Sequence, residues 1–141
     1  MDYWSNGATE PKLGLRQIAA TRDGAANCWN ICWQVENLGR DALAIDSLRL
    51  PHGQFQSPEK QFAPPLELRA GESTRLVTLV QCQEPAGLVT ENAFVIFHCH
   101  WRGESWRIFV RIRVTVQANG EPATATELIT TQKAGFSGLS E

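Results

Sequence analysis

The sequence His98-Cys99-His100 places side chains of the two types that most often bind zinc next to one another. A zinc ion needs three or four ligands that converge on it. Neighbouring residues on an extended strand point to opposite faces, so His98 and His100 share one face and Cys99 faces the other. We therefore predict no metal site and no cofactor. A metal- or thiol-dependent enzyme built around these three residues stays as the alternative hypothesis.

The motif belongs to a predicted hairpin that spans residues 93–116. Two runs of apolar and β-branched residues flank Gly103 and Glu104, which can form a two-residue turn or lie within a four-residue loop. Both turns set the same register, and its inner face is apolar throughout, with cysteine as a small buried hydrophobe. The predicted inner pairs are Trp101/Trp106, Cys99/Ile108, Phe97/Val110, Val95/Ile112 and Ala93/Val114.

The outer face of this hairpin combines arginine with aromatic and aliphatic side chains, which allows guanidinium groups to stack on rings. One interpretation is a self-contained sheet face, in which arginines shield apolar groups from water. The other is a docking surface, because arginine and aromatic residues are enriched at binding hot spots. The predicted outer pairs, which are also the candidate binding residues, are His100/Arg107, His98/Phe109, Ile96/Arg111 and Phe94/Arg113.

The rest of the chain shows short β-branched and aromatic runs separated by turn clusters, which is typical of an all-β sandwich or barrel. The prolines at positions 58, 64 and 65 predict loops or at most an edge strand in that region. We predict an all-β, immunoglobulin-like sandwich of about seven antiparallel strands. The expected strands cover residues 13–20, 28–36, 43–50, 66–69, 74–82, 93–101 and 106–116.

This pattern divides the chain into an N-terminal extension (1–12), one β-sandwich domain (13–116) and a C-terminal segment (117–141). The C-terminal segment is rich in Thr, Ala and Gly and predicts a flexible linker or tail. An alternative is a short segment that orders on a partner or adds a strand to a sheet edge.

Several turns resemble those of a known family. The stretches WQVENLGRDALAIDSLRLPHGQF, PPLELRAGESTRLVTLV and ENAFVIF are similar to immunoglobulin-like domains of the ASPM/SPD-2/Hydin (ASH) and CARDB types. Asn37 and Gly39 match the family's first turn and Gly71-Glu72-Ser73 its second, with Ala70 where proline is usual. The resemblance covers about residues 13–116 and implies a seven-stranded spacer or interaction module without catalytic residues. Cys32 shares a strand face with Asn30 and Gln34, so we predict no disulfide between Cys32 and Cys99.

Composition narrows the function classes. The 141 residues are 43% hydrophobic and 20% charged with a net charge of −2, which describes an ordinary globular protein. No apolar run is long enough to cross a bilayer, and a general basic surface for nucleic acid is absent. No nucleophile motif, phosphate-binding loop or paired metal-ligand spacing is present. If Met1 is the native start, the lack of a signal-peptide pattern predicts a cytoplasmic location.

We therefore predict a non-catalytic module that binds another protein or a neighbouring domain. Docking is expected through the outer face of the 93–116 hairpin, with the 117–141 segment as a second candidate contact. Single-stranded nucleic acid, stacked on Phe94 and Phe109 and held by the arginines, is the second alternative after the enzyme. The oligomeric state is left open.

Overall fold

The computed structural model describes residues 9–24 and 27–134, and these residues form eight β-strands and no helix. None of the described residues therefore belongs to a helix that could span a membrane. The prediction of an all-β domain is confirmed. The strands are β1 (Leu13–Arg22), β2 (Cys28–Asn37), β3 (Leu43–His52), β4 (Phe55–Leu68), β5 (Ser73–Gln81), β6 (Val89–Trp101), β7 (Glu104–Val116) and β8 (Pro122–Lys133).

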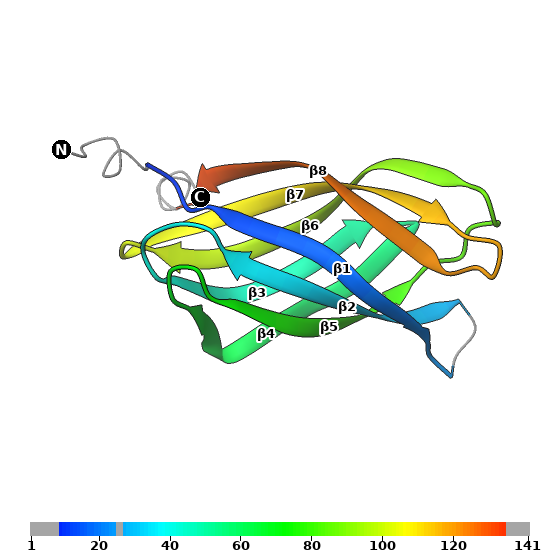
Figure 1. Ribbon diagram of the computed structural model, residues 1–141, viewed down its shortest axis with the longest axis horizontal. Helices are drawn as coiled ribbons and strands as arrows, with labels where there is room; N and C mark the ends of the chain where they lie inside the picture. The colour runs from blue at the N-terminus through cyan, green and yellow to red at the C-terminus, as the bar shows by residue number, and fades with distance from the viewer. Residues whose placement is uncertain (1–8, 25–26, 135–141) are drawn as a thin grey trace.

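The strands form one antiparallel sheet in the order β1-β2-β5-β4-β3-β6-β7-β8, and the sheet curls until β1 and β8 lie side by side (Figure 1). Side chains make the contacts between these two end strands. The Gln17 amide donates to the carbonyl of Pro122 at 3.0 Å and accepts from the N–H of Thr124 at 2.9 Å. The Thr126 hydroxyl donates to the carbonyl of Leu15 at 3.0 Å. The result is a nearly closed barrel with one more strand than the sequence predicts.

The additional strand is β8, so the expectation of a flexible tail over residues 117–141 is wrong for Pro122–Lys133. β8 pairs with β7 along its whole length. It is an end strand with many exposed polar residues, and only Pro122 is buried while Ile129 packs against the core. Such a strand lacks the regular apolar alternation from which strands are predicted in a sequence. Residues 135–141 and 1–8, including the start at Met1 and most of the predicted N-terminal extension, lie outside the described residues.

β4 runs through the proline-rich region. It pairs with β3 in an irregular register and with β5 at a single pair, Gln56↔Gln81. Pro58, Pro64 and Pro65 are all exposed. Proline lacks the N–H that a ladder needs, and a strand with one largely unpaired side tolerates this loss. The expectation of loops or at most an edge strand is therefore wrong for this region, because β4 is a 14-residue strand that lies between β5 and β3 in the sheet.

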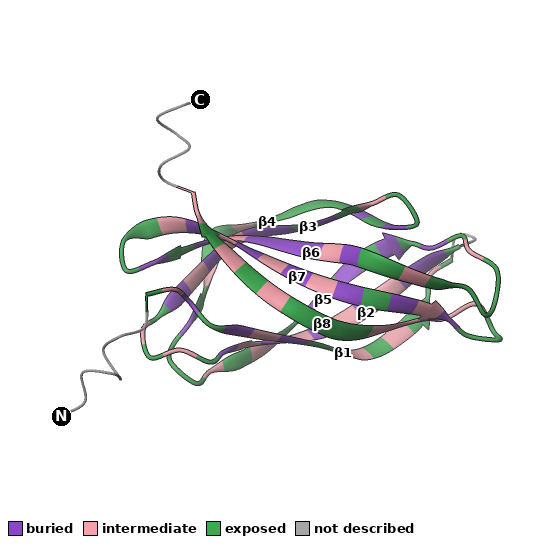
Figure 2. Cartoon of the chain, turned by 90° about the horizontal axis from the view of Figure 1, so that it is seen from above, coloured by how far each residue is buried: buried purple, intermediate pink, exposed green. Residues whose placement is uncertain are grey.

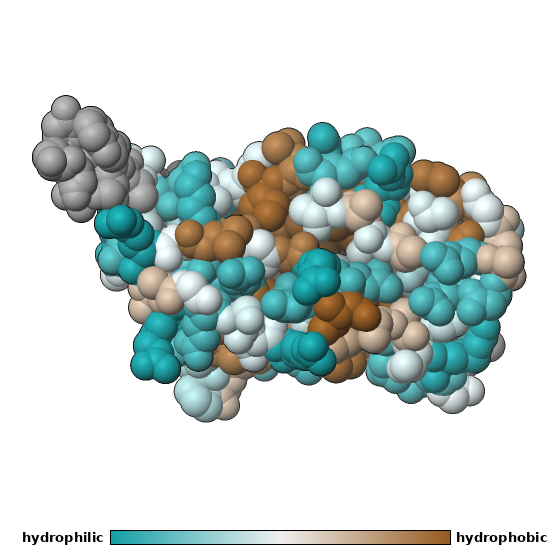
Figure 3. All heavy atoms as spheres, viewed as in Figure 1, coloured by the Kyte–Doolittle hydropathy of each residue, from teal (hydrophilic) through white to brown (hydrophobic). Residues whose placement is uncertain are grey.

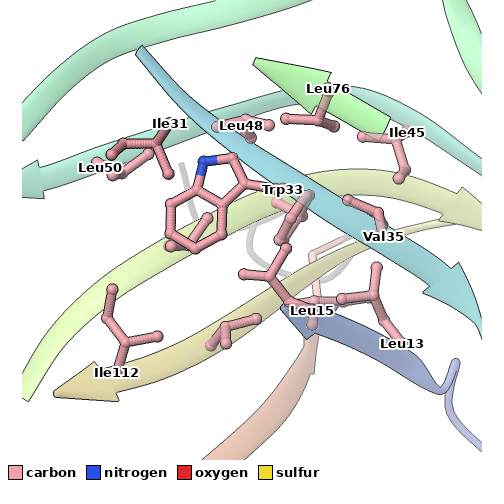
Figure 4. Packing of buried hydrophobic residues seen from close by; sticks show 14 of the residues in the cluster. Leu13, Leu15, Ile31, Trp33, Val35, Ile45, Leu48, Leu50, Leu76 and Ile112 are labelled. Atoms are coloured by element: carbon pink, nitrogen blue, oxygen red, sulfur yellow. The ribbon is translucent and has the colours of Figure 1, made fainter. Parts of the chain in front are cut away.

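Alternation along the strands places the apolar residues inside the barrel, and this alternation is visible along β6 and β7 in Figure 2. Trp33 on β2 is only 1% exposed and lies among aliphatic side chains such as Leu15, Leu48 and Leu50 (Figure 4). Its ring packs edge to face on Phe55, and its Nε1–H donates to the Thr78 hydroxyl at 2.9 Å. On the side seen in Figure 3, apolar residues form small patches between polar ones.

β6 and β7 form the predicted hairpin, but their register differs by two residues from the predicted one. Arg102 and Gly103 alone make the turn, with φ angles of 53° and 75°. A type I′ turn needs positive φ at both central positions, and glycine satisfies this readily at the second. A shift of two residues keeps each side chain on its predicted face, so the division into inner and outer faces is confirmed. The observed inner pairs are Trp101↔Glu104, Cys99↔Trp106, Phe97↔Ile108, Val95↔Val110 and Ala93↔Ile112.

Candidate functional site

The structure places all eight predicted binding residues on the outer side of β6 and β7, alternating with the buried positions. We call this set the arginine-aromatic face. Ile96 is only 6% exposed although it belongs to the outer set. Its strand partners are Arg49 and Phe109, whose longer side chains flank it. The face consists of Phe94, Ile96, His98 and His100 on β6 and Arg107, Phe109, Arg111 and Arg113 on β7. Its cross-strand pairs are His98↔Arg107, Ile96↔Phe109 and Phe94↔Arg111, which replace the predicted ones.

The three arginines of this face differ in their partners. Arg113 forms an ion pair with Glu127 on β8 at 3.6 Å. Arg107 and Arg111 are half-buried, and their Nε atoms are buried without a hydrogen-bond partner. Neither has a carboxylate within 4.0 Å among the described residues. The face therefore carries two cations that the described part of the chain leaves without an ion-pair partner.

His98 lies between Arg107 on β7 and Ser47 on β3. Burial lowers its pKa below the ordinary value, and the charge of Arg107 lowers it further. Near neutral pH the imidazole is therefore uncharged, and the positive charge at the centre of the face belongs to the arginines. Glu59 lies close by, where a hydrogen bond from the Ser47 hydroxyl, 2.8 Å long, lowers the pKa of the carboxyl.

His100 has partners that the sequence analysis did not single out. Its Nδ1 lies 2.7 Å from a carboxylate oxygen of Asp46, and its Nε2 lies 3.2 Å from the Ser105 hydroxyl. Ser105 is the cross-strand neighbour of His100. The predicted register, which differs by two residues, paired His100 with Arg107 instead. Asp46 is the extra residue where the pairing of β3 with β6 shifts between Ile45 and Ser47. No sequence signal marks that irregularity.

The apparent metal motif is divided between the two faces of β6, as the sequence predicts. Cys99 is 1% exposed inside the barrel, whereas His98 and His100 lie outside. Within residues 9–24 and 27–134, no three His, Cys, Asp or Glu side chains are grouped to hold a metal ion. Cys32 is half-buried on the outer side of β2, so it faces away from Cys99, and all four cysteines are free thiols.

Burial raises the pKa of the Cys99 thiol to about 12. At pH 8 only about one molecule in ten thousand would carry the reactive thiolate at this position. We therefore expect iodoacetamide at pH 8 to label the half-buried Cys32 in the native protein and Cys99 only after denaturation. Peptide mapping by mass spectrometry measures both sites in one sample. Rapid labelling of native Cys99 would contradict the structure and revive the thiol-enzyme hypothesis.

Two surface hollows lie away from the arginine-aromatic face. One is lined by Gly14, Arg16 and Gln34 on β1 and β2, and the other lies between residues 57–60 of β4 and 77–79 of β5. Neither hollow contains a residue of the arginine-aromatic face. The face is therefore suited to an extended surface contact rather than to an enclosed small molecule.

Comparisons with known protein families and with curated proteins identify no relative of this chain. Function is therefore inferred from the geometry of the described residues.

Proposed function

We propose that the chain is an interaction module that docks an acidic segment of another protein or of a neighbouring domain on the arginine-aromatic face. Binding rather than turnover is its main role. The observation that carries the proposal is the pair of half-buried arginines, Arg107 and Arg111, without a carboxylate partner in the described chain. The apolar rings of Phe94 and Phe109 lie beside them in the ladder.

The physical basis is charge complementarity combined with an apolar surface. A guanidinium group binds carboxylates through two parallel hydrogen bonds. Arginine and aromatic side chains together also supply most of the binding energy at typical hot spots. Arg107 and Arg111 lie four residues apart on one face of a strand, hence roughly 13 Å apart along it. An extended partner with acidic residues at positions i and i+4 matches this spacing.

The fold is consistent with such a module. β2 lies beside β5 and β3 lies beside β6, which are the neighbours that an immunoglobulin-like Greek key requires. We therefore propose that the first seven strands correspond to the immunoglobulin-like arrangement of the ASH and CARDB types, with β8 added beside β7. Because Pro122–Lys133 belong to the sheet, the proposed docking surface is the arginine-aromatic face alone.

The test uses charge reversal. We expect the double variant Arg107→Glu/Arg111→Glu to bind an acidic peptide at least about tenfold more weakly than the wild type, because like charges then face each other. The probe is a fluorescein-labelled, alternating polar–apolar peptide with Glu at positions i and i+4, and binding is measured by fluorescence anisotropy. The control protein is Arg40→Glu/Arg75→Glu, which makes the same change in net charge at two exposed arginines outside the face.

The control variant should bind as the wild type does, and a peptide with Gln in place of both Glu residues should bind weakly to every protein. Equal binding of the Glu and Gln peptides to the wild type would contradict the proposal. Tighter binding of a single-stranded oligonucleotide than of the acidic peptide, with a steep salt dependence, would favour the nucleic-acid alternative instead. Circular dichroism verifies that each variant is folded.

A further inference from the structure

A chain of three neighbouring polar side chains lies at one end of the hairpin. A carboxylate oxygen of Asp46 lies 2.7 Å from Nδ1 of His100, and Nε2 of His100 lies 3.2 Å from the hydroxyl oxygen of Ser105. In the tautomer with its proton on Nδ1, beside the Asp46 carboxylate, His100 presents the lone pair of Nε2 to the Ser105 hydroxyl. This order, carboxylate to imidazole to hydroxyl, is the arrangement that activates a serine as a nucleophile.

Regular strands and one tight turn hold the three groups in place. Arg102 and Gly103 form the two-residue turn, so Trp101 and Glu104 close it and His100 and Ser105 are the next pair. In an antiparallel ladder that next pair is of the non-hydrogen-bonded kind, in which the side chains approach most closely. Asp46 is supplied by a register irregularity in β3, a feature that redirects side chains in many sheets.

The turn beneath this chain of side chains is well supported. The Trp101 and Trp106 rings pack edge to face with their centroids 5.8 Å apart, on the inner side of the hairpin. The Nε–H of Arg102 donates a hydrogen bond to a carboxylate oxygen of Asp41 at 2.7 Å, and the guanidinium group stacks over the Trp101 ring. His100 and Ser105 are therefore placed by rigid elements, while their side chains stay accessible to a reagent.

A positive charge lies next to the serine. Arg107 follows Ser105 by two residues on the same side of β7, and it has no carboxylate partner within ion-pair distance among the described residues. When a serine oxygen adds to a carbonyl, negative charge develops on the carbonyl oxygen, and a nearby cation stabilises it. The alternative role for the three residues is purely structural, since they also tie β3, β6 and β7 together. That role requires no reactivity.

We propose that Ser105 is an acyl-acceptor residue that reacts with activated esters or thioesters, with His100 as its base and Asp46 as the residue that positions the base. The Ser105 oxygen attacks the acyl carbon, and His100 Nε2 takes the hydroxyl proton. The bond from the acyl carbon to the leaving oxygen or sulfur then breaks, and the leaving group departs with the electron pair. A thiolate takes the proton from His100, whereas a nitrophenolate leaves unprotonated and the proton passes to water. The product is an O-acylated Ser105.

The experiment uses the full chain with p-nitrophenyl acetate as the probe. Release of p-nitrophenolate is followed by absorbance, and the acetylated residue is located by peptide mass spectrometry. We expect a burst of about one equivalent with acetyl on Ser105. Ser105→Ala should abolish the burst, and His100→Gln should slow it at least about tenfold. Asp46→Asn should slow it as well.

The matched control is Ser47→Ala. The Ser47 hydroxyl also donates a hydrogen bond to a carboxylate, that of Glu59, but among the described residues it makes no hydrogen bond to an imidazole. This variant should therefore react as the wild type does. A burst that persists in Ser105→Ala, or acetyl found only on lysine, histidine or Cys32, would overturn the proposal. So would equal rates in the wild type and His100→Gln, provided that tryptophan fluorescence shows both to be folded.

Discussion

Replacing Trp33 with alanine is expected to lower the free energy of unfolding by about 3–5 kcal/mol, which is the cost of removing a large aromatic side chain from a packed core. Trp33 is 1% exposed and lies where β1, β2 and β3 contribute side chains to one cluster (Figure 4). The substitution also leaves the Thr78 hydroxyl, which accepts the indole N–H, buried without that partner. Since small domains are stabilised by only about 5–15 kcal/mol, this loss is a large share of the total.

Urea denaturation followed by far-ultraviolet circular dichroism measures the effect. Leu79→Ala is the control, because Leu79 is 48% exposed on β5 and should change the unfolding free energy by less than about 0.5 kcal/mol. Thr78→Val should have an intermediate effect of about 1–3 kcal/mol, because it keeps the volume and removes only the acceptor. A Trp33→Ala variant as stable as the control would show that Trp33 is not at the centre of the core.

Removal of β8 by truncation after Gln117 is expected to abolish cooperative folding. β8 pairs with β7 over its length. It also forms hydrogen bonds with β1, from the N–H of Thr124 to the Gln17 side chain and from the Thr126 hydroxyl to the carbonyl of Leu15. Without it the whole edge of β7 loses its partner, and the space between β1 and β7 opens to water. An exposed, long strand edge also promotes aggregation.

The shortened chain should elute as aggregate in size-exclusion chromatography and bind a hydrophobic dye, whereas the full chain should not. Thr130→Ala is the control within the same strand, because Thr130 is exposed and its substitution should alter stability by less than about 0.5 kcal/mol. A truncated chain that unfolds cooperatively at the same urea concentration as the full chain would show that residues 118–141 are indeed a dispensable tail.

Regular alternation made part of this fold predictable. Each run with an apolar residue at every second position became a strand, and the assignment of Cys99 to the core and His98 to the surface followed from the same period. The register of the hairpin could not be predicted from this alternation. Both the predicted pairing and the observed one, two residues apart, keep the apolar residues inside. Only the backbone of Arg102 and Gly103 decides between them.

The candidate site was predictable only where it depends on alternation. All eight residues of the arginine-aromatic face lie on one surface because β6 and β7 are regular. Asp46 reaches His100 from β3 through a register irregularity, and local sequence does not specify such an irregularity. For residues 117–141 an added edge strand was only the alternative prediction, because an end strand buries few residues and the sequence of β8 resembles that of a polar linker.

The contact between β1 and β8 also brings the entry and exit of the described chain together. The Thr131 hydroxyl donates to the carboxylate of Glu10, and the N–H of Ala134 donates to the carbonyl of Ser105 at 2.8 Å. Both ends of the described chain therefore leave the barrel at the end that carries the Arg102–Gly103 turn. Such a domain can be inserted into a surface loop of a host protein, or circularly permuted through a short linker, without rearranging its strands.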